Sequence, residues 1–156
     1  MKTSVAIPPG KPAVNRARLR RLLTFFMEKA THKSGQCWSE VSLVLTNDHG
    51  IREVNHLHLG HDYSTDVISY TFAPLPGQPT GEASGEIFVN AELARKVGSR
   101  FGGVNRELAL YMAHGCDHLS GEDDHTPAKR QRMRRRELRW LAEAARLNLL
   151  TGLLAS

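Results

Sequence analysis

The chain has 156 residues, a hydrophobic fraction of 40% and a charged fraction of 24%, a composition typical of one globular domain with its own core. The sequence contains no apolar run near the roughly 20 residues of a membrane span and no secretory signal segment. Its two cysteines are too few for a disulfide framework, which favours a cytoplasmic protein, and its net charge of +5 favours a polyanionic partner.

The predicted elements mix helices and strands along the whole chain. Residues 1–14 hold three prolines and a glycine and are predicted to form a flexible lead-in to a single domain over residues 15–150. Apolar periodicity and capping residues predict, in chain order, a helix over 15–30, a strand over 38–46, a helix after Asn47, a strand over 67–72, a loop over 73–84, a strand over 86–90, and helices over 92–100, 105–119 and 127–147. The predicted fold class is therefore α+β, with a small mixed sheet packed against several helices.

Two runs of basic residues indicate a kind of partner. The first run lies on the helix predicted over 15–30 and consists of Arg16, Arg18, Arg20 and Arg21. The second lies on the last predicted helix, has Glu137 as its only acid, and consists of Lys129, Arg130, Arg132, Arg134, Arg135, Arg136 and Arg139. Either run alone is equally well explained as a solvated helix face. Two such runs in a small domain favour nucleic acid binding.

A pair of histidines indicates a metal site on the helix predicted over 105–119. His114 and His118 are four residues apart, so both imidazoles lie on one helix face and can bind one metal ion. Such a pair also arises by chance among eight histidines. Gly115 stands where a zinc protease has its general-base glutamate, so peptide hydrolysis by that mechanism is not expected.

The turn after this helix is expected to supply a third metal ligand. Gly121 lets the chain turn back over the helix face. Asp123, Asp124 and His125 follow it and offer carboxylate or imidazole ligands. Two helical histidines and one ligand from the turn leave a coordination position open for water, which is typical of a catalytic zinc site.

Three motifs of this chain resemble motifs of the YbeY family of bacterial zinc-dependent endoribonucleases and ribosomal RNA maturation factors, and they follow one another in the same order as in that family. The family's Thr-Asp-Val-Leu-Ser-Phe motif is similar to residues 65–70, and its Gly-Asp/Glu-Ile strand is similar to residues 85–87. Its metal motif, His-Gly-x-Leu-His-Leu-x-Gly-Tyr-Asp-His, is similar to residues 114–124. The resemblance covers residues 41–141.

The resemblance implies a zinc-dependent endoribonuclease that binds one Zn²⁺ per chain and acts on single-stranded RNA. It implies a role in 16S ribosomal RNA processing and ribosome quality control, with ribosomal RNA and the small ribosomal subunit as partners. The proton acceptor would be Asp66, Glu122 or Asp123, and the sequence does not choose among them. The expected contacts with RNA phosphates lie on the basic last helix, at Arg130, Arg134, Arg135 and Arg139.

The metal motif of this chain departs from the family pattern at three positions. The family's third metal histidine aligns with Asp124, which is a competent zinc ligand and the first choice here. His125 stands one position later and is the second choice. Asp117 replaces a leucine between the histidines and is expected to be a surface acid, while Glu122 replaces a tyrosine.

A fourth departure bears on catalysis. Leu59 stands where the family usually carries an arginine, so His61, Arg52 or an arginine of the last helix would have to steady the phosphate instead. This departure and the altered third ligand favour, as an alternative, a non-catalytic zinc-containing assembly factor that binds RNA and the ribosome. A hydrolase of small phosphate or amide substrates is a third interpretation, but a small substrate needs no extended basic surface.

Overall fold

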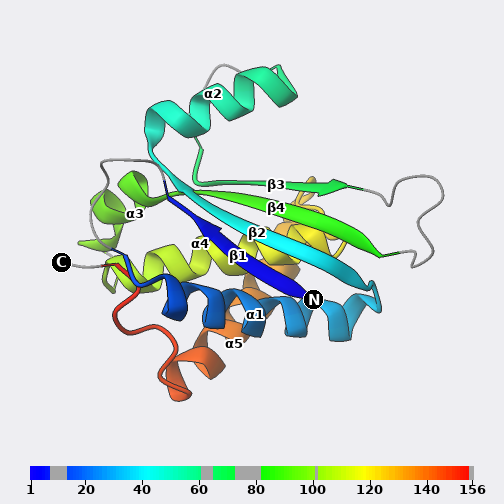
Figure 1. The fold of residues 1–156 in the computed structure, drawn as a ribbon. Coiled ribbons are helices and arrows are strands. Elements are labelled where there is room, and N and C mark those ends of the chain that lie inside the picture. The colour runs from blue at the N-terminus through cyan, green and yellow to red at the C-terminus, as the bar shows by residue number, and fades with distance from the viewer. Residues whose placement is uncertain (8–13, 61–64, 73–81, 101, 155–156) are drawn as a thin grey trace.

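The computed structural model describes residues 1–7, 14–60, 65–72, 82–100 and 102–154 (Figure 1). Its elements are β1 (Lys2–Ala6), α1 (Arg16–Ser34), β2 (Trp38–Thr46), α2 (Asp48–Leu59), β3 (Val67–Phe72), β4 (Ala83–Asn90), α3 (Ala91–Gly98), α4 (Val104–Leu119) and α5 (Pro127–Arg146). Most of the loop predicted over 73–84 lies outside the described residues, as does His61. Among the described helices, none has the length and apolar character that crossing a membrane requires.

A four-stranded mixed sheet organises the fold, in the order β1-β2-β4-β3. β1 and β4 run parallel to β2, whereas β3 pairs antiparallel with β4. The alternation predicted for β2 is present, because Val41, Leu43 and Leu45 are buried and the residues between them are only partly buried. The structure therefore confirms the α+β class with a small mixed sheet.

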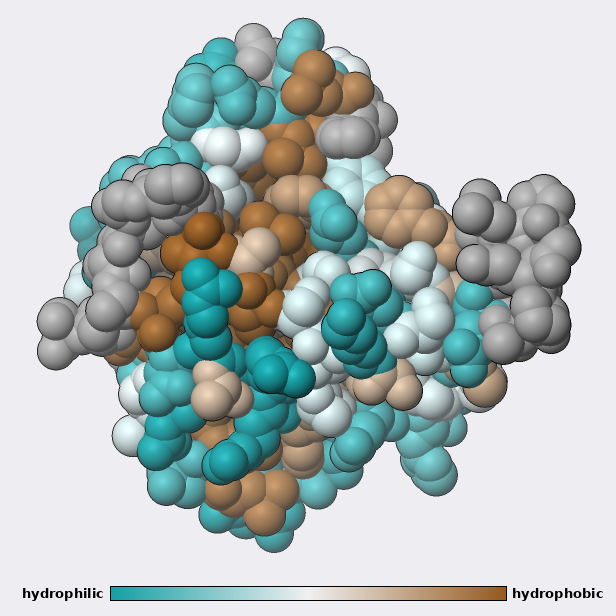
Figure 2. Space-filling model, in the orientation of Figure 1, coloured by the Kyte–Doolittle hydropathy of each residue, from teal (hydrophilic) through white to brown (hydrophobic). Residues whose placement is uncertain are grey.

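The helices are distributed unequally around the sheet. α1 and α4 pack against the strands, and α5 packs on α4, while α2 lies apart from these three helices beside β3 (Figure 1). Figure 2 shows the molecule from the same side, with hydrophobic atoms reaching from α2 onto the sheet and hydrophilic atoms predominating over α1. The helix α4, which carries the two histidines of the metal motif, therefore lies between the sheet and α5.

The N-terminal segment differs from the prediction. Residues 2–6 form β1, which pairs parallel with residues 40–44 of β2, and Thr3 is buried. The prediction of a flexible lead-in is wrong for these residues, because five residues give too short an apolar alternation to outweigh the neighbouring prolines. At the other terminus Leu153 and Leu154 are buried, and Leu154 bridges to Val14.

α1 is longer than predicted. Asn15 caps its first turn by accepting a hydrogen bond from the backbone N–H of Arg18, and the predicted apolar face is buried. The helix continues to Ser34 instead of ending at Ala30, and Gly35 ends it with a φ of 74°. The extra turn matters for the site, because it brings Lys33 to the end of α4.

Candidate metal centre

α4 passes so close to the sheet that only a glycine fits at position 115. A Cβ there would lie 2.6 Å from Cγ2 of Ile87 and 3.1 Å from Cγ2 of Val67. The Ser69 hydroxyl also donates a hydrogen bond to the Gly115 carbonyl at 3.0 Å. A glutamate in this position would collide with the strands. The close approach explains why the general base of a zinc protease is absent, and it holds the histidine-bearing end of α4 against β3 and β4.

Three of the predicted ligands converge at the end of α4. Nε2 of His114 and Nε2 of His118 are 3.0 Å apart, and Oδ2 of Asp124 lies 3.8 Å and 3.7 Å from them. The three side chains are 25%, 29% and 38% exposed, so an ion can reach them from solvent. One nitrogen or oxygen from each residue can therefore bind the same metal ion.

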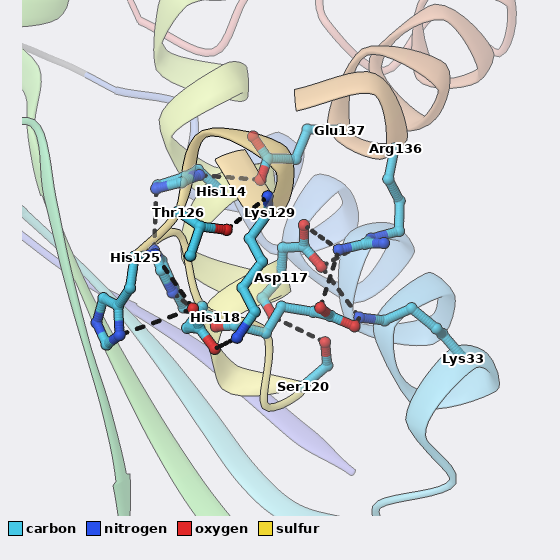
Figure 3. Close-up of polar contacts among 12 residues, drawn as sticks. Lys33, His114, Asp117, His118, Ser120, His125, Thr126, Lys129, Arg136 and Glu137 are labelled. Carbon is cyan, nitrogen blue, oxygen red and sulfur yellow. Dashed lines mark hydrogen bonds and ion pairs between the residues drawn. The ribbon is translucent and has the colours of Figure 1, made fainter. Parts of the chain in front are cut away.

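Hydrogen bonds at the other ring nitrogens orient both imidazoles (Figure 3). Nδ1 of His114 donates to Oε2 of Glu137 at 2.9 Å, and Nδ1 of His118 donates to the backbone oxygen of Glu122 at 3.0 Å. Because a carbonyl oxygen only accepts, Nδ1 of His118 carries a proton, and in the neutral ring the lone pair is then on Nε2. Two lone pairs 3.0 Å apart repel each other unless they share a cation, either a proton or a metal ion. This donor set fits zinc.

Glu137, which the sequence analysis does not single out, contacts one of the predicted metal ligands. Burial alone would lower the pKa of His114, but the hydrogen bond and negative charge of Glu137, together with the negative charges of Asp66 and Asp124, outweigh it and raise that pKa. The Glu137 carboxylate thus makes the imidazole ring of His114 more basic. The sequence did hold a signal, because Glu137 is an acid on the apolar stripe of α5, among Met133, Trp140 and Leu141.

Replacing Glu137 with glutamine keeps a hydrogen-bond acceptor for His114 and removes the carboxylate charge. We expect Zn²⁺ affinity, measured by competition with a chromophoric chelator, to fall about 10-fold to 100-fold. Glu143→Gln is the matched control, because Glu143 lies on the same helix and pairs with Lys29, away from the site. Equal affinities in the two variants would show that Glu137 does not tune the metal site.

The residues of the turn after α4 separate into different environments. Asp124 joins the two histidines, whereas the side chain of His125 is 84% exposed and its Nδ1 lies 3.7 Å from Oδ1 of Asp123. The other oxygen of Asp123 accepts a hydrogen bond from Lys129 at 3.0 Å. The structure therefore brings Asp124 to the histidine pair and leaves the imidazole of His125 and the carboxylate of Asp123 outside this cluster.

Two pockets flank the histidine pair. One, of about 490 Å³, is lined by Asp66, His114 and Arg134 together with neighbouring side chains. The other, of about 470 Å³, is lined by His118, His125 and Ser69 among others. Of the three predicted proton acceptors, Asp66 is thus the one that shares a described pocket with a member of the metal cluster.

The basic face of α5 begins at the metal centre. The four arginines predicted to contact RNA are all exposed, namely Arg130, Arg134, Arg135 and Arg139. Nη1 of Arg130 donates a hydrogen bond to the backbone oxygen of Asp124 at 3.1 Å. Arg134 lines the same pocket as His114. A polyanion lying along α5 would therefore be led to the histidine pair.

Asp117 is fully buried, so the prediction of a surface acid is wrong. Arg136 donates two hydrogen bonds to its carboxylate, at 2.9 Å from Nε and 3.0 Å from Nη2. Lys33 donates a third at 3.1 Å. Two cations from other helices compensate this buried charge, and the local sequence around Asp117 cannot reveal them. The Glu122 carboxylate also accepts a hydrogen bond from Lys33, at 2.9 Å, so Lys33 bridges the two carboxylates.

Comparison with known proteins identifies relatives over most of the chain. A family model described as Endoribonuclease YbeY matches residues 10–145. A relative of that name from Salinibacter ruber is 32% identical over 124 residues, which are 76% of this chain and 79% of the relative. One from Anaeromyxobacter sp. is 34% identical over 146 residues, 93% of this chain and 70% of the relative. One from Elusimicrobium minutum is 42% identical over 97 residues, 60% of this chain and 66% of the relative.

The fold is also similar to a solved structure. The solution structure of a Thermotoga maritima protein covers 99% of this chain, which covers 97% of that protein in turn, with a TM-score of 0.60. At 20% identity this likeness shows the fold alone. The family model is the stronger finding, because residues 65–70, 85–87 and 114–124 all lie within its match. The chain therefore belongs to the endoribonuclease YbeY family, and it is a hydrolase of the nuclease class.

Proposed function

We propose that this chain is a zinc-dependent endoribonuclease that cleaves single-stranded RNA and binds one Zn²⁺ through His114, His118 and Asp124. The observation that carries the proposal is the convergence of two imidazole Nε2 atoms and one carboxylate oxygen between two pockets. Asp124 is preferred to His125 because its carboxylate reaches both imidazoles. When bound, zinc would lower the pKa of a coordinated water to about 7 and polarise a phosphoryl oxygen.

The chain's own residues have distinct roles in this proposal. Asp66 accepts a proton in the pocket that it shares with His114. Arg134 lines the same pocket and steadies the charge of the phosphate. It would thereby replace the family's usual arginine, whose position is occupied by Leu59 in this chain. Glu137 and the backbone oxygen of Glu122 keep the imidazoles in their binding orientation.

The substrate proposed here is ribosomal RNA, in 16S processing and ribosome quality control, with the small ribosomal subunit as partner in the cytoplasm. The exposed arginines of α5 support an extended polyanionic partner. Contacts with phosphates supply affinity and no sequence information. Selection among RNAs would therefore come from single-stranded shape or from docking on the ribosomal particle.

Neutralising the basic face of α5 is expected to weaken RNA binding and its dependence on salt. For Arg135→Gln with Arg139→Gln, the slope of log affinity against log salt should decrease by about 0.7 per lost phosphate contact. The measurement is fluorescence anisotropy of a labelled single-stranded RNA at several KCl concentrations. Arg95→Gln is the control, because Arg95 lies on α3 and belongs to neither of the two basic runs. An unchanged slope in the double variant would place the RNA elsewhere.

The sequence also raises a non-catalytic assembly factor as an alternative, which membership of an endoribonuclease family disfavours. Two departures from the family pattern favour it, namely Asp124 at the third ligand position and Leu59 at the arginine position. A cleavage assay on single-stranded RNA separates the two functions, with the chain first stripped by a chelator and then supplied with Zn²⁺. Endonucleolytic products that appear only with Zn²⁺ support the nuclease. RNA binding without turnover in either state supports the assembly factor.

A further inference from the structure

Four charged side chains form a cluster beside the metal centre, and Figure 3 labels three of them, Lys33, Asp117 and Arg136. This charge cluster consists of Lys33 from the last turn of α1, Asp117 from the last turn of α4, Glu122 from the turn after α4, and Arg136 from α5. Lys33 bridges both carboxylates, at 3.1 Å from Asp117 and 2.9 Å from Glu122. Arg136 binds Asp117 through two nitrogens and lies 3.6 Å from Glu122. The cluster therefore joins three helices and the ligand-bearing turn.

The stability of the fold gives little reason for this cluster. The side chain of Asp117 is 0% exposed, and those of Arg136 and Lys33 are 16% and 25% exposed. Removing charges from water costs free energy that a buried ion pair repays only in part, and apolar residues of similar volume often stabilise a fold as well or better. What an ion cluster adds is fixed geometry, especially where a guanidinium binds a carboxylate through two parallel hydrogen bonds.

The geometry that the cluster fixes is that of the metal centre. Asp117 immediately precedes His118, and Arg136 immediately precedes Glu137, the acceptor for Nδ1 of His114. Glu122 is held by its carboxylate, while its backbone oxygen accepts the hydrogen bond from Nδ1 of His118. Each hydrogen bond that orients an imidazole is therefore held in place by the charge cluster. Arg136 fixes the position of Glu137, and the carboxylate contacts of Glu122 fix its backbone oxygen. The same turn carries Asp124 two residues later.

We propose that the charge cluster positions the metal centre, with Lys33 and Arg136 holding α4, α5 and the turn between them in the arrangement that presents the three ligands. This inference rests on the proposed metal site. Lys33 and Arg136 are positioning residues in this account, because they act through Asp117 and Glu122 and touch neither ion nor substrate. Glu122 also belongs to this support and Asp123 pairs with Lys129, which leaves Asp66 as the proton acceptor of the proposed site.

The sharpest test compares two lysines on the same face of α1. Lys33→Met should weaken Zn²⁺ binding by about tenfold, measured by competition with a chromophoric chelator. Lys29→Met should leave Zn²⁺ affinity unchanged, because Lys29 pairs with Glu143 at 2.7 Å and not with the turn after α4. The metal-free Lys33→Met variant should melt at a lower temperature than Lys29→Met, because it removes one of the two cations that compensate the buried Asp117 carboxylate. Lys33→Arg, which keeps the charge, should recover most of the affinity.

Arg136→Lys tests the two-nitrogen contact with Asp117 separately. It keeps the positive charge and loses the paired hydrogen bonds, so Zn²⁺ affinity should again fall by about tenfold. If Lys33→Met and Lys29→Met bind Zn²⁺ equally well while their circular dichroism shows intact folds, the positioning role is overturned. If the unaltered chain binds no Zn²⁺, the proposed metal site itself fails and the positioning role fails with it, so the wild-type titration distinguishes the two failures.

Discussion

His118→Ala is expected to abolish RNA cleavage while leaving RNA binding almost unchanged. The variant loses one of two imidazoles that face each other at 3.0 Å, and with it the metal's stabilisation of charge on the reacting phosphate. Several kcal/mol of such stabilisation correspond to a fall in turnover of at least about 1000-fold. The arginines predicted to contact RNA lie on α5 and are unchanged. Turnover is measured on a fluorophore-quencher single-stranded RNA with Zn²⁺, and binding by anisotropy.

His32→Ala is the matched control for this loss, because His32 is an exposed histidine near the end of α1. It should keep full turnover and full RNA binding. Cleavage that survives in His118→Ala would contradict the proposed metal site. A joint loss of binding and turnover, with circular dichroism showing an intact fold, would contradict the separation of the metal centre from the RNA-binding face.

Asp124→Ala and His125→Ala are expected to differ sharply in Zn²⁺ affinity. Oδ2 of Asp124 lies 3.8 Å and 3.7 Å from the two Nε2 atoms, whereas the side chain of His125 is 84% exposed and faces Asp123. Asp124→Ala should weaken binding by more than the roughly 100-fold that the loss of an outer-shell contact costs. His125→Ala should bind like the unaltered chain in the same chelator competition.

The substitution Asp124→His completes this comparison. It places the imidazole of the family pattern at the aligned position, and it should retain Zn²⁺ if the turn keeps its path. Strong binding by Asp124→Ala together with weak binding by His125→Ala would reverse the assignment of the third ligand. That result would mean that the turn after α4 shifts by one residue when an ion binds.

Much of the fold follows from periodicity in the sequence. The helix over 105–119 was predicted because apolar residues recur along it, and the structure has α4 over Val104–Leu119. The strand over 38–46 was predicted because its apolar residues alternate, and β2 has the same bounds. β1 was missed because its pairing with β2 brings together residues far apart in the chain, which leaves only a weak local pattern.

The charged support of the metal centre could not be predicted in the same way. From its local sequence, Asp117 looks like a surface acid. Its charge is compensated by Arg136 and by Lys33, which is 84 positions away in the chain. The spacing of the two histidines predicted their common face, because four residues make about one helical turn. It could not choose between Asp124 and His125, because that choice depends on the path of the turn at Gly121, where φ is 96°.

The zinc content of the purified chain, measured by mass spectrometry beside His114→Ala, tests the proposed metal site most directly. We expect about one Zn²⁺ per unaltered chain and almost none in the variant, because each histidine supplies one of three ligands. No bound zinc in the unaltered chain, even after Zn²⁺ is supplied, would contradict the account and leave a metal-free RNA-binding protein as the better description.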